Sequence, residues 1–353
     1  MRYLVVALLG VHGLLHLLGL QFGKVLGAVW GLAALGLVAA AALLLARQEH
    51  WWVVAAAALV FSQALITTAW KTARAGSVLN LVLAIPVMVA AAEARFEHRS
   101  RTARAHLLSH LPAAPASIVR AEELAPLPPP VRRWLEASGV VGRERAQVVR
   151  LHQRGELRTA ADQPWMHAEA HQIFTVDEPG FVWTVAVTMK GLPVVGRDSY
   201  QDGRGHMLIT VAGLVPVVDG RGPEIDQGTL LRFLGEIVWF PSAALAPYLR
   251  WEPIDDHSAR ATMTWRGVEA SGVFTFDDQG RQVKMSARRY KSDGPTASLE
   301  RWEVPAVAWE RRGGVLMPVR GTAVWKLGAG DLEYYRWEIT DVSYNHAALE
   351  GQP

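Results

Sequence analysis

The N-terminal part of this chain contains four long apolar runs separated by short polar breaks. The runs are Tyr3–Leu20, Val25–Ala46, Trp51–Trp70 and Gly76–Ala92. Each has close to the ~20 residues that an α-helix needs to cross ~30 Å of hydrocarbon. The sequence therefore predicts an anchor of four transmembrane helices over residues 1–94.

A cleaved signal peptide is the alternative for the first run. It is disfavoured because more apolar sequence follows, with no small-residue cleavage pattern near Leu20. Trp51, Trp52 and Trp70 bracket the third run, at the depth where aromatic side chains meet lipid headgroups. These flanks favour a spanning helix.

The loop charges favour one orientation of the anchor. After four passes both of its ends lie on one side, where the cations are Arg2, Arg47, Arg95, Arg99, Arg101 and Arg104. The other side has Lys24, Lys71 and Arg74. Because Lys and Arg accumulate in cytoplasmic loops, this bias predicts an inner-membrane protein whose large C-terminal domain is cytoplasmic.

The formal charge of +3 combines two regions of opposite sign. Residues 1–104 contain nine Lys and Arg against three Asp and Glu, a net charge of +6, which leaves −3 for the remainder. The basic segment thus lies beside the membrane, and membrane lipids are the expected partners. The acidic domain argues against a nucleic-acid partner.

The rest of the chain divides into a connector and one domain. Residues 95–130 are basic and then proline-rich, ending in Pro128-Pro129-Pro130. Residues 131–138 read as a short helix stopped by Gly139. We expect residues 131–353 to form a single domain of ordinary size.

Period-two alternation dominates that domain. Phe181, Trp183, Val185 and Val187 share one face of a predicted strand, and polar or small residues share the other. Similar stretches are residues 145–158, 164–176, 204–212, 257–266, 268–276, 281–290, 315–327 and 332–344. Short turns separate many of them, which predicts a large curved antiparallel sheet or open barrel within an α+β domain.

One insertion, near residues 228–248, has helical spacing instead. Leu230, Phe233, Leu234 and Ile237 fall on one helix face, and Pro241 begins the exit. A second short helix is expected at 241–248. Such helices usually cover one face of a curved sheet.

Several motifs occur in an order that resembles an uncharacterised bacterial family of membrane-anchored domains of unknown function. The motifs are Gln153–Arg158, Trp165, Phe181–Trp183, Arg197–Tyr200, Pro223-Glu224 and Leu231–Pro241, the last containing the string RFLGEIVWFP. The resemblance covers residues 125–346 and implies no activity. The succession of elements also loosely resembles the half-barrels of lipoprotein-localisation factors, which implies an apolar concavity able to hold acyl chains.

The aromatic residues and the motif helix supply the candidate ligand site. Eight tryptophans of the domain either line an apolar cavity or fill the core: Trp183, Trp239, Trp251, Trp265, Trp302, Trp309, Trp325 and Trp337. Arg232 and Glu236 lie one helical turn apart and can pair. They form either a structural pair or, with Asp198, Tyr200 or Glu224, a polar cluster that orients a ligand headgroup.

Catalytic and metal-binding signals are weak. The sequence has no G-x-S-x-G, H-E-x-x-H or P-loop motif. Asp255-Asp256-His257 follows a proline in an expected turn, where solvation is the ordinary role. His167 and His171 share a strand face but lie about 13 Å apart. We expect neither a metal site nor a cofactor, and whether the chain is an enzyme stays open.

Two histidines lie inside the first apolar run. His12 and His16 share a helix face, and ionisable residues in a membrane generally face the interior of the helix bundle. They either bond to Ser62, Gln63, Thr67 or Asn80 or serve a metal, haem or proton-handling role.

The most favoured function is the binding of a hydrophobic or amphiphilic, lipid-like ligand in a concave β domain. Its expected site residues are Trp183, Asp198, Tyr200, Arg232, Glu236 and Trp239. A hydrolase acting on a lipid-like substrate, or a structural interaction module without catalysis, is the alternative.

A reporter fused after Pro353 tests the predicted orientation. We expect a fluorescent protein at this position to fluoresce, and alkaline phosphatase to be inactive because its disulfides do not form in the reducing cytoplasm. An active phosphatase together with a dark fluorophore would show that the C-terminal domain lies on the opposite side of the membrane.

Overall fold

The structure is a computed structural model that describes residues 2–112, 114–293 and 296–346. It contains two compact units. The first is the chain up to His98 together with Ala212–Leu214, and the second consists of Arg99–Val211 and the chain from Val215 onward.

The first unit is helical. Its elements are α1 (Arg2–His16), the 3-10 helix η1 (Leu17–Phe22), α2 (Lys24–Leu45), α3 (Trp51–Thr68), α4 (Trp70–Ala73) and most of α5 (Gly76–Leu108). Four segments are long and apolar enough to cross a membrane, namely Arg2–Phe22, Lys24–Leu45, Trp51–Thr68 and Gly76–Leu108. The predicted set of four apolar helices is confirmed, and α5 continues through residues 95–104, which the sequence assigned to the connector.

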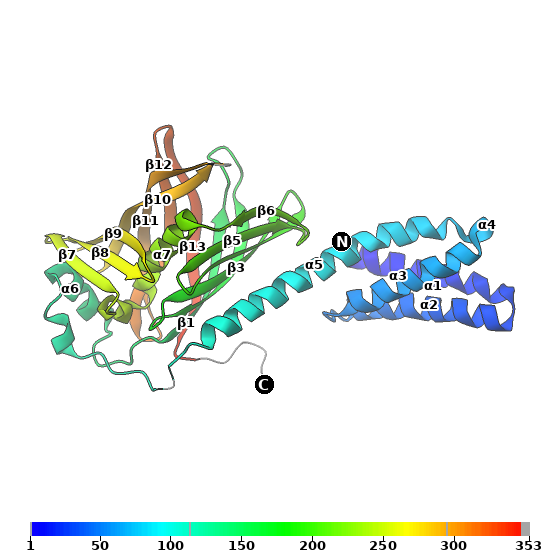
Figure 1. The fold of residues 1–353 in the computed structure, drawn as a ribbon, viewed down its shortest axis with the longest axis horizontal. Coiled ribbons are helices and arrows are strands. Elements are labelled where there is room, and N and C mark those ends of the chain that lie inside the picture. The colour runs from blue at the N-terminus through cyan, green and yellow to red at the C-terminus, as the bar shows by residue number, and fades with distance from the viewer. Residues whose placement is uncertain (1, 113, 294–295, 347–353) are drawn as a thin grey trace. The chain divides into compact units, whose positions relative to one another are not determined.

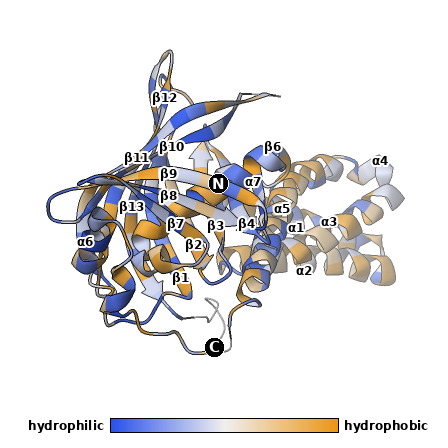
Figure 2. Cartoon of the chain, turned by 60° about the vertical axis from the view of Figure 1, so that its left-hand side comes forward, coloured by the Kyte–Doolittle hydropathy of each residue, from blue (hydrophilic) through white to orange (hydrophobic). Residues whose placement is uncertain are grey.

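Large apolar side chains also cover the outer surface of these helices. Leu9, Leu37 and Leu83 are completely buried between the helices, whereas Leu32 and Leu81 point outward with 61% and 71% of their surface exposed. Figure 2 shows hydrophobic colouring along much of the visible side of these helices. A helix that is apolar all round needs an apolar environment, and a bilayer provides one.

A buried polar network joins α1, α3 and α5 within this unit. The imidazole Nε2 of His12 bonds to Asn80 Oδ1 at 2.7 Å. The hydroxyl of Ser62 donates to the same oxygen at 3.0 Å, and Asn80 Nδ2 donates to Gln63 at 3.0 Å. Inter-helix hydrogen bonds of this kind fix the register of membrane helices. His16 bonds through Nδ1 to the carbonyl of His12.

The second unit is built on one antiparallel sheet of thirteen strands that curls into a half-barrel (Figure 1). The strands are β1 (Val148–Leu157), β2 (Met166–Thr175), β3 (Gly180–Met189), β4 (Leu192–Gln201), β5 (Arg204–Val211), β6 (Val215–Gly220), β7 (Leu249–Asp255), β8 (Ser258–Trp265), β9 (Val268–Phe276), β10 (Gln282–Asp293), β11 (Thr296–Arg312), β12 (Val315–Leu327) and β13 (Gly330–Tyr344). Their spatial order is β6-β5-β4-β3-β2-β1-β13-β12-β11-β10-β9-β8-β7. The predicted fold class is therefore confirmed.

Short helices cover the sheet. They are η2 (Ala121–Leu124), α6 (Pro129–Ser138), α7 (Pro223–Glu236), η3 (Ile237–Trp239) and η4 (Pro241–Leu245). Helix α7 lies within the curl, in contact with β4 and β5 on one arm and with β8, β9 and β10 on the other (Figure 1). The end of α5 packs on the outer face, where Leu107 contacts Val148, Ile173 and Val182.

Aromatic side chains fill the space between α7 and the sheet. Phe174 of β2 lies 4.8 Å from the ring of Phe240 and 6.1 Å from the rings of both Phe181 and Phe233. All four residues are buried. Aromatic pairs at such separations stabilise a core beyond the area that they bury.

The structure differs from the sequence expectation at four strands and at the helices. Strands β4, β6, β7 and β11 were not anticipated. In β4 the reason is the buried polar run Arg197–Ser199, which breaks the apolar–polar alternation. Helix α7 begins at Pro223, before residue 228, and the second helix is the 3-10 helix η4, which ends at Leu245.

Gly205 at the start of β5 permits α7 to approach the sheet. A Cβ at this position would clash with the hydroxyl of Thr229 and lie 2.7 Å from the carbonyl oxygen of Ile225. Both atoms belong to the first turns of α7, so any larger residue forces helix and strand apart.

We expect Gly205→Ala to lower the free energy of unfolding by roughly 1–3 kcal/mol, as overpacking does in tight cores. Chemical unfolding of the full chain, followed by tryptophan fluorescence, measures the change. Gly328→Ala is the control because a Cβ there meets no atom within 4 Å. Equal stability of the two variants would show that the close approach of α7 does not exclude a side chain at position 205.

Candidate functional site

Helix α7 is tied to the sheet at its N-terminal end by Asp226. The carboxylate of Asp226 accepts the backbone N–H of Gly205 at 2.7 Å and pairs with Arg204 at 3.0 Å. An acidic residue in the first turn is also favoured by the helix dipole. This attachment determines which residues of the last turns face the curl of the sheet.

Arg232 is the centre of a charged cluster on the inner face. Its Nη1 donates to Asp198 of β4 at 2.8 Å, and its Nε donates to Glu236 one turn later at 2.9 Å. The side chains of Arg232 and Glu236 are each 14% exposed, and that of Asp198 only 2%. The guanidinium also lies 4.7 Å from the Trp183 ring and 5.1 Å from that of Phe181.

Two buried glutamines extend the cluster across β1 and β2. Gln172 donates to Glu236 at 2.7 Å, and Gln153 donates to Gln172 at 3.2 Å. Tyr335 of β13 and Trp183 of β3 both donate to the side-chain oxygen of Gln153. The result is a continuous polar chain from β13 to β4, which we call the Arg232 network.

Burial governs the protonation states in this network. It raises the pKa of the Glu236 carboxyl above its ordinary value, although Arg232 and Gln172 favour the ionised form. Burial works against the charged form of Arg232 as well, but Glu236 and Asp198 outweigh it, so the pKa of Arg232 is raised. The guanidinium is thus a cation beside one carboxyl whose protonated form is favoured by burial.

An apolar strip continues from the Arg232 network along the same face of β2, β3 and β4. The register pairs Trp183 with Gln172 and Asp198, and the next inward residues of β3 are Val185 and Val187. The strip consists of Ala168, Ala170, Val185 and Val187, flanked by Leu157, Met166, Trp183 and Val194. Because strands rise ~3.3 Å per residue, it extends about 13 Å beyond the polar row.

The structure brings together four of the six expected site residues, Trp183, Asp198, Arg232 and Glu236. Tyr200 is completely buried on β4, and its hydroxyl has no partner among the described residues. Burial raises its pKa. Trp239 lies in the core, where its ring is 5.4 Å from that of Trp337 and its Nε1 donates to Pro318.

The remaining candidates lie elsewhere. Glu224 is exposed in the first turn of α7, eight residues and about 12 Å along the helix axis from Arg232. Asp255 accepts the N–H of His257 at 2.9 Å, which is an ordinary turn contact. His167 is 95% exposed. Of the tryptophans, Trp239, Trp302, Trp325 and Trp337 are buried in the core.

Sequence reasoning missed Gln153, Gln172 and Tyr335. The signal that could have identified the glutamines is a long amide side chain at an inward position of an otherwise apolar strand. Two cavities lie outside the network. One of 20 Å³ is lined by His106 and Trp265 among others, and a groove of 390 Å³ is lined by residues that include Ile118 and Asn345.

The raised pKa of Glu236 predicts a pH-dependent stability. Above the ordinary value of 4.5, the unfolded chain loses the Glu236 proton while the native state still holds it. The free energy of unfolding therefore falls as the pH rises through this window. Glu236→Gln mimics the protonated form. We therefore expect its free energy of unfolding to decrease less with rising pH.

Thermal unfolding of the full chain between about pH 5 and about pH 8 measures this difference. The control is Glu169→Gln, because Glu169 lies on the outer face, is 68% exposed and pairs with Arg154. Parallel pH profiles for the wild type and Glu236→Gln would contradict the raised pKa.

Comparison with known proteins supplies a family. No curated protein matches the sequence. Similar solved structures include two of low sequence identity. A DUF1329 family protein from Desulfovibrio piger ATCC 29098 has 8% identity and a TM-score of 0.37 over 64% of this chain and 93% of its own. A putative outer membrane lipoprotein-sorting protein domain from Vibrio parahaemolyticus has 11% identity and a TM-score of 0.35 over 57% and 87%.

The family model matches residues 117–337, which include strands β1 to β12, the first half of β13, α7 and the whole Arg232 network. The match covers more than half of the chain. The chain therefore belongs to DUF6544, a family of unknown function.

Proposed function

We propose that the half-barrel binds an amphiphile, with its apolar tail on the apolar strip and its headgroup at the Arg232 network. The observation that carries this proposal is the position of Trp183. Its ring contacts the Arg232 guanidinium at 4.7 Å and packs against the strip. A polar cluster adjoining an apolar surface matches the two ends of an amphiphilic molecule.

The strip itself is buried, but Met166 and Val194 at its end are half-buried. Beyond Val187, strand β3 turns at Lys190 and Gly191 into Leu192, which is 53% exposed. An acyl chain entering there would replace water on Val194 and Met166 and lie along the strands toward Val187. Each buried methylene contributes about 0.8 kcal/mol, so a short stretch of chain suffices for useful affinity.

The charge balance of the network selects the headgroup. Arg232 is already neutralised by the Asp198 carboxylate and donates a further hydrogen bond to Glu236, so it has no surplus charge for an anion. Oδ1 of Asp198 is a buried acceptor without a partner among the described residues. A headgroup that donates hydrogen bonds, such as a glycerol hydroxyl, satisfies it, whereas a carboxylate headgroup is repelled.

The hydrolase alternative has one observation in its favour, the raised pKa of Glu236, since catalytic acids are often tuned in this way. Both carboxyl oxygens of Glu236 are engaged, however. One accepts from Arg232 at 2.9 Å and the other from Gln172 at 2.7 Å. This arrangement favours a positioning role in binding.

The proposed location is the cytoplasmic side of the inner membrane, on the evidence of the loop charges. The covalent connection through α5 keeps the half-barrel within reach of membrane lipids as a source of ligand. The proposed partners are accordingly lipids and lipid-like small molecules.

We expect the full chain in detergent to bind monooleoylglycerol and to bind oleate at least about tenfold more weakly, because oleate brings an anion to a cluster that already holds two carboxyls. Native mass spectrometry with titrated lipid measures both affinities. Val187→Asp places a charge on the strip and should abolish the difference between the lipids.

Ala186→Asp is the matched control. Ala186 is the neighbouring residue on β3, points to the opposite face and is exposed. Both variants have the same membrane helices and should bind the same amount of lipid there. A difference in lipid binding between them therefore comes from the half-barrel. Equal lipid binding by wild type, Val187→Asp and Ala186→Asp would refute the proposed ligand site.

A further inference from the structure

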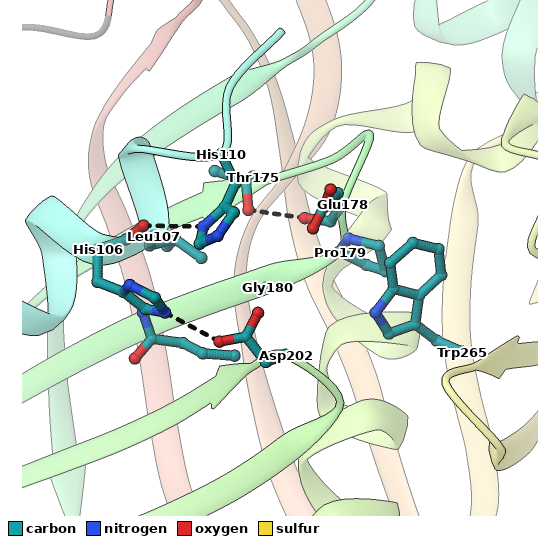
Figure 3. Close-up of a pocket in the computed structure, with 10 residues that line it drawn as sticks. His106, Leu107, His110, Thr175, Glu178, Pro179, Gly180, Asp202 and Trp265 are labelled. Carbon is teal, nitrogen blue, oxygen red and sulfur yellow. Dashed lines mark hydrogen bonds and ion pairs between the residues drawn. The ribbon is translucent and has the colours of Figure 1, made fainter.

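A cluster of two histidines and one aspartate lies on the outer side of the half-barrel and shares no residue with the Arg232 network. His106 is in the last turn of α5, His110 follows two residues after the helix ends, and Asp202 lies in the turn between β4 and β5. One ligand atom from each of these side chains lies within 4.8 Å of the other two. Figure 3 shows His106 and Asp202 pointing toward each other, with His110 beside them.

We propose that His106, His110 and Asp202 bind a divalent transition-metal ion of the zinc class. Two imidazoles and one carboxylate are the ligands that zinc and its neighbours prefer, whereas magnesium and calcium prefer oxygen ligands alone. The i, i+4 spacing of the histidines presents both rings on one side of the chain, with centroids 4.8 Å apart.

The hydrogen bonds around the cluster prepare it for a metal. Nδ1 of His110 donates to the carbonyl of His106 at 3.1 Å, which leaves the lone pair on Nε2 for a metal. Metal-bound histidines almost always donate their other N–H in this way. Nε2 of His106 donates to Asp202 at 2.9 Å. When an ion binds at Nε2, the neutral ring carries its proton on Nδ1, and the Asp202 carboxylate becomes a ligand of the same ion.

The surrounding charges suit a cation. Glu178 lines the same pocket, and Arg266 lies 3.4 Å from Glu178 and 3.9 Å from Asp202. With neutral histidines the local charge is therefore −1, from two carboxylates and one guanidinium. Because His106 and Asp202 are 50% and 42% exposed, water completes the coordination at the fourth position.

The site connects two elements that the fold already holds together. Leu107 packs on the outer face of the sheet, and Gln201 donates to the carbonyl of Ala103 at 2.7 Å. A bound ion would fasten the end of α5 to the β4–β5 turn. The same turn leads directly into Gly205, where α7 is attached. The metal would therefore stabilise the end of the half-barrel at which β4, β5 and α7 meet.

Titration of the full chain, purified with an affinity tag that lacks histidine, tests the proposal. We expect saturable binding of one Zn²⁺, visible absorption bands of four-coordinate Co²⁺ when that ion replaces zinc, and slower hydrogen exchange of residues 103–111 with Zn²⁺ present. His110→Ala and Asp202→Asn should each weaken Zn²⁺ binding by at least about tenfold.

Asp202→Asn is expected to fold normally, because Asp202 has a φ of +54° and Asn tolerates this conformation. His257→Ala is the control, since His257 is another exposed histidine beside a carboxylate, Asp278 at 3.8 Å. Zn²⁺ affinity that is unchanged in both cluster variants, or that falls equally in His257→Ala, would overturn the proposal.

Discussion

The ion triad of Arg232, Asp198 and Glu236 is the interaction on which the inner face of the half-barrel depends. Asp198 belongs to β4 and the other two residues to α7, so the triad fixes how the helix is rotated against the sheet. A guanidinium bonds through several N–H groups in fixed directions. Rotation of α7 by one residue would break these bonds and turn Phe233 out of the core.

The triad and the aromatic core contribute to the stability of the domain in different ways. Each buried phenylalanine of the cluster around Phe174 contributes about 1.5–3 kcal/mol through removal of apolar surface from water. A buried ion pair often adds little to net stability because desolvation offsets its attraction, yet removal of one partner costs roughly 3–5 kcal/mol. The core therefore holds the domain together, and the triad selects one arrangement of α7. Its strict geometry is also what leaves the polar chain adjacent to the apolar strip.

Much of the architecture was predictable because it follows from local patterns. Apolar runs of about 20 residues define membrane helices, and period-two alternation defines strands such as β3. The spacing of Leu230, Phe233 and Ile237 defined α7. Strand β4 was not predicted because its polar residues Arg197–Ser199 are buried by partners far away in sequence. A local sequence pattern does not reveal such burial.

The candidate site was predictable only in part for the same reason. The pairing of Arg232 with Glu236 is local to one helix and was anticipated, and Asp198 was one of three residues considered as further partners. The approach of Gln153 and Gln172 depends on strand register, which the sequence alone does not specify. The cluster of His106 and Asp202 joins residues 96 positions apart, and the expectation of no metal site followed from examining close neighbours such as His167 and His171.

Photolabelling tests the central claim, that the inner face of the half-barrel holds an amphiphile, most directly. A monoacylglycerol with a diazirine in its acyl chain would be irradiated with the full chain in lipid nanodiscs, and the labelled residues of the soluble domain identified by mass spectrometry. The account predicts labels on inward residues of β2–β4, above all Met166, Val187 and Val194, and competition by unlabelled monooleoylglycerol. Labels confined to the outer faces of these strands, at Thr188 or Ala186, would contradict it.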